Sequence, residues 1–114
     1  MDKRSKLVED FYVAGLRYWD AIEVIGDIKV GDKLDIVLES DNQYDPNAII
    51  LGYKGKKLGY VPKACNSQIS QLLFFGYDIF DAYVSQIRLD AAPEQQLRVA
   101  VRLKGHGVTT VEYR

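Results

Sequence analysis

Residues 40–50 read S-D-N-Q-Y-D-P-N-A-I-I, and the rest of the chain is organised around this stretch. It separates two β-like runs, 34–39 and 48–53, by more than the two residues of a tight hairpin turn. Pro46 fixes its own φ and pushes the preceding residue into an extended conformation, and Asn47 tolerates the left-handed conformation that often follows proline. The pattern predicts a stiffened loop between two strands.

The loop carries an aromatic ring, Tyr44, next to a carboxylate, Asp45. A ring face can stack on a base, and a carboxylate accepts a hydrogen bond from a hydroxyl group, so the pair suits a nucleotide-end site. The loop alone leaves an alternative open. Asx residues and proline also close ordinary turns, and Tyr44 would then be a half-buried lid on the core.

Length and composition predict one soluble, globular domain. The chain has 114 residues, of which 47% are hydrophobic and 27% charged, enough for one modest core. No apolar run approaches the ~18 residues of a membrane span, and the start of the chain lacks the apolar segment of a signal peptide. The single Cys65 excludes an internal disulfide and fits a reducing compartment. We therefore expect a cytoplasmic protein.

The formal net charge is −1. Proteins that bind a duplex backbone over a long track are usually strongly basic, so extensive coating of nucleic acid is not expected. A short, local contact with nucleic acid is compatible with this charge.

Hydrophobic periodicity predicts about six strands and one clear amphipathic helix. The helix begins at Pro62 and ends at Gly76, and its core face carries Cys65, Ile69, Leu72 and Leu73. A short second helix is expected over 21–25. The predicted strands are 11–15, 34–39, 48–53, 57–61, 77–89, with a bulge near 85–86, and 97–104.

These elements indicate a mainly β, OB-like, partly closed barrel, a class whose faces and loops commonly bind single strands. We expect residues 1–10 to be a flexible N-terminus, 11–104 to form the domain, and 105–114 to be a tail or a last short strand.

Catalytic equipment is missing from the sequence. The single histidine, His106, lies between two glycines, and Cys65 falls on the apolar helix face, so neither forms a nucleophile–base pair or a zinc site. No phosphate-binding glycine loop or dinucleotide fingerprint occurs, and the acidic residues are scattered. We expect no enzyme activity, no metal and no cofactor.

Taken in chain order, the motifs resemble the HIRAN domain family. They are G-L-R-Y at 15–18, G-D-K-L-D-I-V-L at 31–38, D-N-Q-Y-D-P-N-A-I at 41–49 and L-G-Y-V-P at 58–62, followed by the amphipathic helix. The match covers residues 11–103. HIRAN domains occur attached to Swi/Snf-type DNA translocases and as stand-alone bacterial proteins, which this chain looks like.

The resemblance implies a DNA-binding module that recognises single-stranded DNA at a free 3′-hydroxyl end, in DNA repair or replication-fork processing, with helicase or translocase proteins as further partners. It assigns stacking to Tyr18 and Tyr44, and the 3′ hydroxyl to Asp45. Tyr60 replaces a histidine of some members, and a later stacking aromatic has no counterpart in 89–96. The implied DNA-binding residues are Arg17, Tyr18, Asn42, Tyr44, Asp45, Tyr60 and Lys63.

A second hypothesis remains open. The near-neutral charge is also compatible with a protein-interaction domain that keeps the barrel and has lost the DNA site. An enzyme is the third and least supported interpretation.

Overall fold

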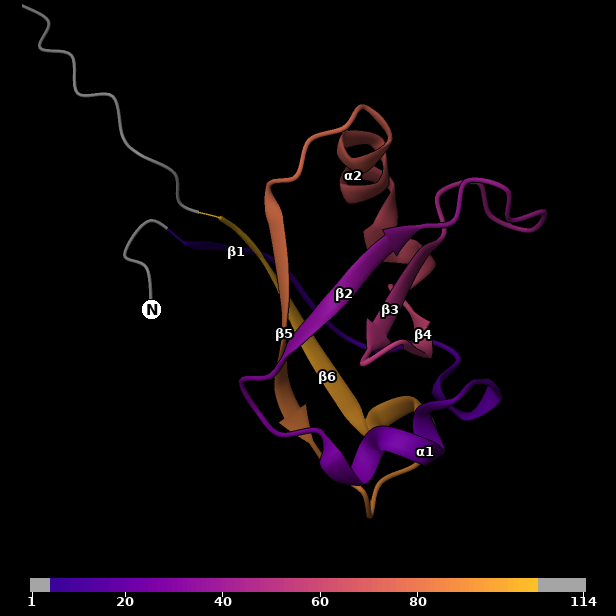
Figure 1. Cartoon of the computed structure of the whole chain (residues 1–114), viewed down its shortest axis with the longest axis vertical. Helices are drawn as coiled ribbons and strands as arrows, with labels where there is room; N and C mark the ends of the chain where they lie inside the picture. The colour runs from indigo at the N-terminus through magenta and orange to yellow at the C-terminus, as the bar shows by residue number, and fades with distance from the viewer. Residues whose placement is uncertain (1–4, 105–114) are drawn as a thin grey trace, which may run out of the picture.

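The computed structural model describes residues 5–104, apart from the side chain of Arg17. Figure 1 shows strands crossing the middle of the molecule, with helix α2 and helix α1 near opposite ends. The elements are β1 Lys6–Tyr12, the 3₁₀ turn η1 Leu16–Tyr18, α1 Ala21–Val24, the 3₁₀ turn η2 Ile25–Asp27, β2 Lys33–Leu38, β3 Ile49–Tyr53, β4 Lys56–Tyr60, α2 Lys63–Phe74, β5 Phe80–Ile87, the 3₁₀ turn η3 Pro93–Gln95 and β6 Leu97–Leu103.

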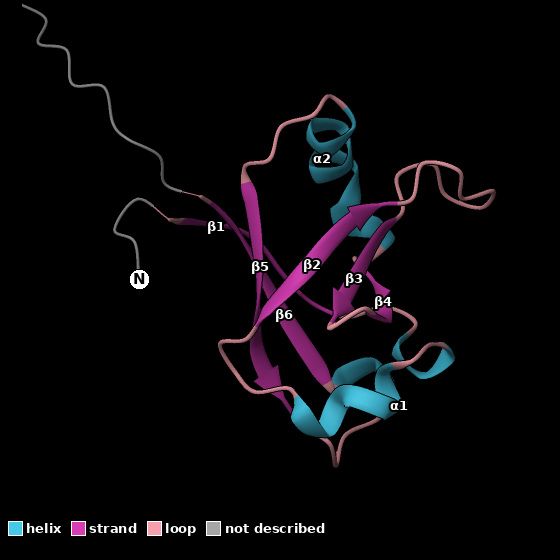
Figure 2. Ribbon diagram, viewed as in Figure 1, coloured by secondary structure: helices cyan, strands magenta, loops and turns pink. Residues whose placement is uncertain are grey.

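The strands form one antiparallel sheet in the order β1-β6-β5-β2-β3-β4 (Figure 2). The predicted mainly β fold is confirmed. The sheet does not close into a barrel, because β1 and β4 are its two edges. The chain just after β1 reaches β4 through an isolated bridge, in which Ala14 and Tyr60 exchange two backbone hydrogen bonds of 2.9 Å.

Gly59 makes this approach sterically feasible. A Cβ atom placed on Gly59 would clash with the carbonyl oxygen of Ala14 and the Cγ1 of Val13. Backbone atoms cannot move aside as a flexible side chain can, so the position requires a residue without Cβ. The glycine of the G-Y-V-P motif therefore brings the two edges of the sheet together at this point.

Alternating side chains build the core as the sequence pattern predicts. Leu97, Val99 and Val101 of β6 are buried, and the buried residues of β5 lie on the same core. The register of β5 against β6 shifts between Val84 and Gln86, which confirms the predicted bulge. Helix α2 ends at Phe74, and Gly76 just beyond it stops the helix as expected: its φ of 85° turns the chain so that the N–H of Tyr77 bonds to the carbonyl of Leu72.

The expected start of the first strand is wrong. Strand β1 begins at Lys6 and pairs with β6 along its whole length, from Lys6 opposite Leu103 to Tyr12 opposite Arg98. The prediction of a flexible N-terminus over residues 1–10 is therefore wrong for 6–10. Their charged side chains suit an exposed edge strand that is held by backbone hydrogen bonds. Residues 105–114, predicted to be a tail or last strand, lie outside the described residues.

Candidate nucleic-acid interface

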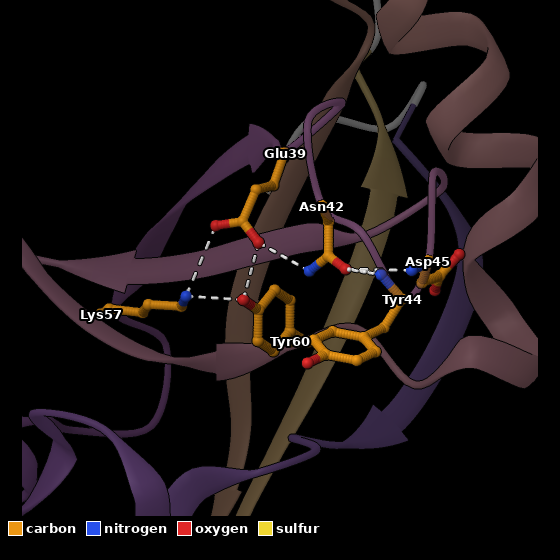
Figure 3. Close-up of polar contacts among 6 residues, drawn as sticks. All are labelled: Glu39, Asn42, Tyr44, Asp45, Lys57 and Tyr60. Carbon is orange, nitrogen blue, oxygen red and sulfur yellow. Dashed lines mark hydrogen bonds and ion pairs between the residues drawn. The ribbon is translucent and has the colours of Figure 1, made fainter.

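The loop between β2 and β3 is held in shape by Asn42. Its Oδ1 accepts hydrogen bonds from the backbone N–H groups of Tyr44, at 2.8 Å, and Asp45, at 2.9 Å (Figure 3). The backbone N–H of Asn42 donates a hydrogen bond to the carbonyl of Glu39 at 3.1 Å. An Asx side chain that bonds nearby backbone groups in this way imitates a turn, so the sequence sets this shape locally. The loop is therefore held by Asn42 rather than by a left-handed Asn47, because Lys54 is the one described non-glycine residue with a positive φ.

The Asp45 carboxylate is fixed from two sides. Its Oδ1 accepts a hydrogen bond from the backbone N–H of Asn47 at 2.9 Å, and its Oδ2 accepts one from Nδ2 of Asn66 at 2.8 Å. Asn66 lies on α2 and is only 2% exposed, so the helix anchors the loop from behind. Asp45 does cap its own turn. A carboxylate has about four acceptor sites, so this role leaves capacity for a ligand hydroxyl.

A polar network below the loop connects it to β4. The Tyr60 hydroxyl donates to Oε1 of Glu39 at 2.8 Å, and Asn42 Nδ2 donates to the same oxygen at 2.8 Å (Figure 3). Lys57 Nζ donates to the Tyr60 hydroxyl at 2.6 Å and lies 3.5 Å from Oε2 of Glu39. The bond from Tyr60, more than any other contact, holds the pKa of Glu39 below its ordinary value.

Next to this network lies a pocket of about 440 Å³, lined by residues of the loop, the end of β4, the start of α2 and the segment after β1. Of the predicted site residues, five meet here: Asn42, Tyr44, Asp45, Tyr60 and Lys63. The other residues that line the pocket are Ala14, Trp19, Ala48 and Val61.

Tyr44 is 91% exposed at the edge of this pocket. The alternative in which Tyr44 is a half-buried lid on the core is therefore wrong. An exposed ring on a braced backbone is available for stacking without first leaving the core.

Tyr18 does not share the pocket with Tyr44. It belongs to η1, is 68% exposed, and lines a separate hollow of about 250 Å³ with Gly15, Leu16, Pro93 and Glu94. The backbone of Arg17 lies in the same turn, and its side chain lies outside the described part of the chain. The two predicted stacking residues therefore occupy different hollows.

Trp19 also lines the pocket, although the sequence motifs assign it no role. Its ring packs edge-to-face on Tyr60, with centroids 5.9 Å apart and an interplanar angle of 74°. Lys57 Nζ lies 3.5 Å from the centre of the Trp19 ring, a cation–π contact. The sequence has an arginine next to two aromatic residues, Arg17-Tyr18-Trp19. This pattern indicates a binding surface but does not indicate which of the two rings lines the pocket beside the loop.

Residues 5–104 contain no group of three or more His, Cys, Asp or Glu that could hold a metal ion. Within the same range, no helix is long and apolar enough to span a membrane. Burial and, to a smaller extent, the Glu9 carboxylate raise the pKa of the Cys65 thiol, which fits a half-buried cysteine packed against the core rather than a nucleophile.

Comparisons with known proteins agree with the motifs. The family model of the HIRAN domain matches residues 8–106. A solved protein from Lactobacillus plantarum is similar, with a TM-score of 0.74 and 27% identity over 87% of this chain and 94% of that one. The HIRAN domain of human HLTF has a TM-score of 0.61 and 17% identity over 91% of this chain and 84% of that one. No curated protein matches. The chain belongs to the HIRAN domain family, a family of DNA-binding modules.

Proposed function

We propose that the pocket between the loop and β4 binds the free 3′-hydroxyl end of single-stranded DNA. The observation that carries this proposal is the exposed ring of Tyr44 on a loop whose next residue, Asp45, is held by Asn47 and Asn66. A ring for the last base and a carboxylate for the last hydroxyl are thus presented together. The loop backbone and the Asp45 carboxylate are already held before the ligand arrives, which lowers the entropic cost of binding.

Each side chain has a defined role in this proposal. Tyr44 stacks on the terminal base, and the edge-to-face pair of Trp19 and Tyr60 forms the wall behind it. Lys63, exposed at the first position of α2, meets a phosphate. Asn42 shapes the loop. Tyr18 and Arg17 bind further along the strand, from the neighbouring hollow.

Asp45 supplies the end selectivity. An ionised carboxylate accepts a charge-assisted hydrogen bond from a 3′ hydroxyl. A 3′ phosphate at the same place brings a second negative charge into a half-buried site and is repelled. Continuing strands are rejected for the same reason.

Recognition of a free 3′ end fits a role in DNA repair or replication-fork processing, with helicase or translocase proteins as partners. We place the protein in the cytoplasm in this proposal. A binding module of this kind needs no catalytic group of its own.

One observation favours the second candidate, a protein-interaction domain. Beside the DNA pocket, on the other side of Trp19, lies an apolar hollow of about 420 Å³ lined by residues that include Ile22 and Leu89. Ile22 is 87% exposed and Leu89 55% exposed. Exposed aliphatic groups around a hollow are typical of surfaces that bind proteins.

A titration with fluorescent oligonucleotides decides between the two candidates. Wild type is expected to bind a 3′-hydroxyl strand and to bind a 3′-phosphate strand more weakly, and Asp45→Asn is expected to reduce that preference. Asp41→Asn, an exposed carboxylate on the same loop, is the matched control and should behave as wild type. Equal binding of both ends by wild type would refute end recognition, and no binding of either strand would favour the protein-interaction candidate.

A further inference from the structure

We infer that Glu39 is the positioning residue of the pocket: its carboxylate locks the loop and the aromatic wall into one arrangement without touching the DNA. This inference rests on the proposed function, since it names the residue that prepares that site. The sequence motifs and the family resemblance assign no role to Glu39.

The geometry places Glu39 at the junction between the two sides of the pocket. It directly follows β2, and Lys57 and Tyr60 lie on β4, on the far side of β3. Its Oε1 accepts from Asn42 on the loop side and from Tyr60 on the sheet side, both at 2.8 Å. One oxygen atom therefore joins the loop to the wall (Figure 3).

The network reaches the rings of Tyr60 and Trp19 and the backbone of Tyr44. Tyr60 is held through its hydroxyl, and Tyr44 through Asn42, which accepts the Tyr44 backbone N–H. Trp19 is held by Lys57, which lies over its ring and also donates to Tyr60. Loss of the carboxylate removes the acceptor that these donors share, so the loop that carries Tyr44 loses its fixed relation to the rings of Trp19 and Tyr60.

The same bonds define what Tyr60 can offer a ligand. Its hydroxyl donates to Glu39 and accepts from Lys57, so its one proton is already used. Tyr60 therefore contributes its ring rather than its hydroxyl to the pocket. The Lys57 charge is likewise balanced by Glu39, which leaves Lys63 as the exposed cation among the residues that line the pocket.

A mutant series tests the inference with a 3′-hydroxyl oligonucleotide as the probe. Glu39→Ala is expected to weaken binding by about tenfold or more, the effect of losing hydrogen bonds to a charged group. Glu39→Gln keeps an acceptor oxygen and should recover part of that loss. Asp35→Ala, which removes an exposed carboxylate from β2, is the control and should bind as wild type. Binding by Glu39→Ala within about twofold of wild type would overturn the inference.

A double-mutant cycle separates positioning from a general loss of stability. If Glu39 acts through Asn42, the double variant Glu39→Ala with Asn42→Ala should lose clearly less affinity than the product of the two single losses. Losses that simply multiply would show independent effects and would contradict the inference. Thermal unfolding midpoints of each variant establish that the compared proteins are folded.

Two readouts without DNA keep this inference separate from the proposed function. Trp19 is the chain's one tryptophan, so its emission reports directly on the Lys57 contact. Amide exchange at Tyr44 and Asp45 reports on the loop. Both should change in Glu39→Ala and not in Asp35→Ala. If wild type binds no oligonucleotide, the proposed function fails, and unchanged emission and exchange in Glu39→Ala would separately defeat the positioning role.

Discussion

The loop between β2 and β3 and the C-terminal end of α2 both expose aromatic rings, and they differ in what surrounds those rings. Tyr44 is 91% exposed, next to the Asp45 carboxylate and across a pocket from Lys63. Phe74 and Phe75 are 66% and 67% exposed and pack edge-to-face on each other, with centroids 5.3 Å apart. The hollow beside them, about 510 Å³, is lined otherwise by Ser40, Pro46, Asn47, Ser67, Ser70 and Gln71, none of which is charged.

This contrast shows that exposure of a ring does not by itself identify a DNA site. At the loop, the ring comes with a carboxylate and a lysine, and its backbone is fixed by Asn42. At the helix end, the rings of Phe74 and Phe75 pack on each other. The partial negative charge of a helix C-terminus disfavours a phosphate there. The loop has the chemistry for a nucleotide, and the helix end does not.

The largest effect that would sharpen this comparison is expected from Tyr44→Ala. Loss of a stacked base should cost about 1–3 kcal/mol of binding to a 3′-hydroxyl strand. Phe75→Ala removes a ring of similar size and should leave affinity unchanged. Tyr18→Ala should cost less than Tyr44→Ala, because Tyr18 lies in the separate hollow. Equal losses for Tyr44→Ala and Phe75→Ala, measured by fluorescence titration, would break the comparison.

A smaller effect is expected from Asn66→Ala, which removes the anchor between α2 and Asp45. Because Asn66 is buried and donates to a carboxylate, its loss should lower the free energy of unfolding by about 1–2 kcal/mol and weaken the preference for a 3′ hydroxyl. Ser67→Ala, one residue along on the exposed side of the helix, is the control for helix propensity. Urea unfolding and the two-end titration measure both quantities, and unchanged end preference would show that the anchor is not needed.

The smallest effect concerns salt. With Arg17 and Lys63 as the proposed phosphate contacts, roughly two counterions should be released, and each contributes about −0.7 to the log–log slope on single strands. Binding measured across a range of salt concentrations should therefore weaken only gently. A slope several times steeper would point to a basic surface beyond the loop side of the molecule.

Local sequence signals predicted much of the fold. The alternation in β6, the bulge in β5 and the end of α2 shortly before Gly76 each depend on residues next to one another in the chain. The face of α2 was less predictable. Ile69 is buried and Cys65, Leu72 and Leu73 pack half-buried against the core as expected, but the polar Asn66 and Ser70 are buried as well, against the loop. A hydrophobic pattern does not predict buried polar residues whose hydrogen-bond partners lie in a distant loop.

The candidate site likewise contains some residues that local sequence predicts and others that it does not. The loop residues Asn42, Tyr44 and Asp45 were predictable because the turn chemistry is contained in the loop itself. The contacts of Glu39 with Lys57 and Tyr60 cross from the end of β2 to β4, so they depend on strand register, which periodicity does not supply. Trp19 was missed for a related reason, since its partners lie on β4.

The close approach at Gly59 has a consequence for how the protein folds. Ala14 and Tyr60 meet across a long stretch of chain that contains β2, β3 and most of β4, so their contact carries a larger loop-closure entropy than any hairpin in the sheet. We expect it to form after the hairpins, and changes at Gly59 to accelerate unfolding more than they slow folding. Both Ala14 and Tyr60 line the pocket. The binding site would then be complete only after these hairpins have formed, and a bound strand would hold the contact closed and lengthen the lifetime of the native state.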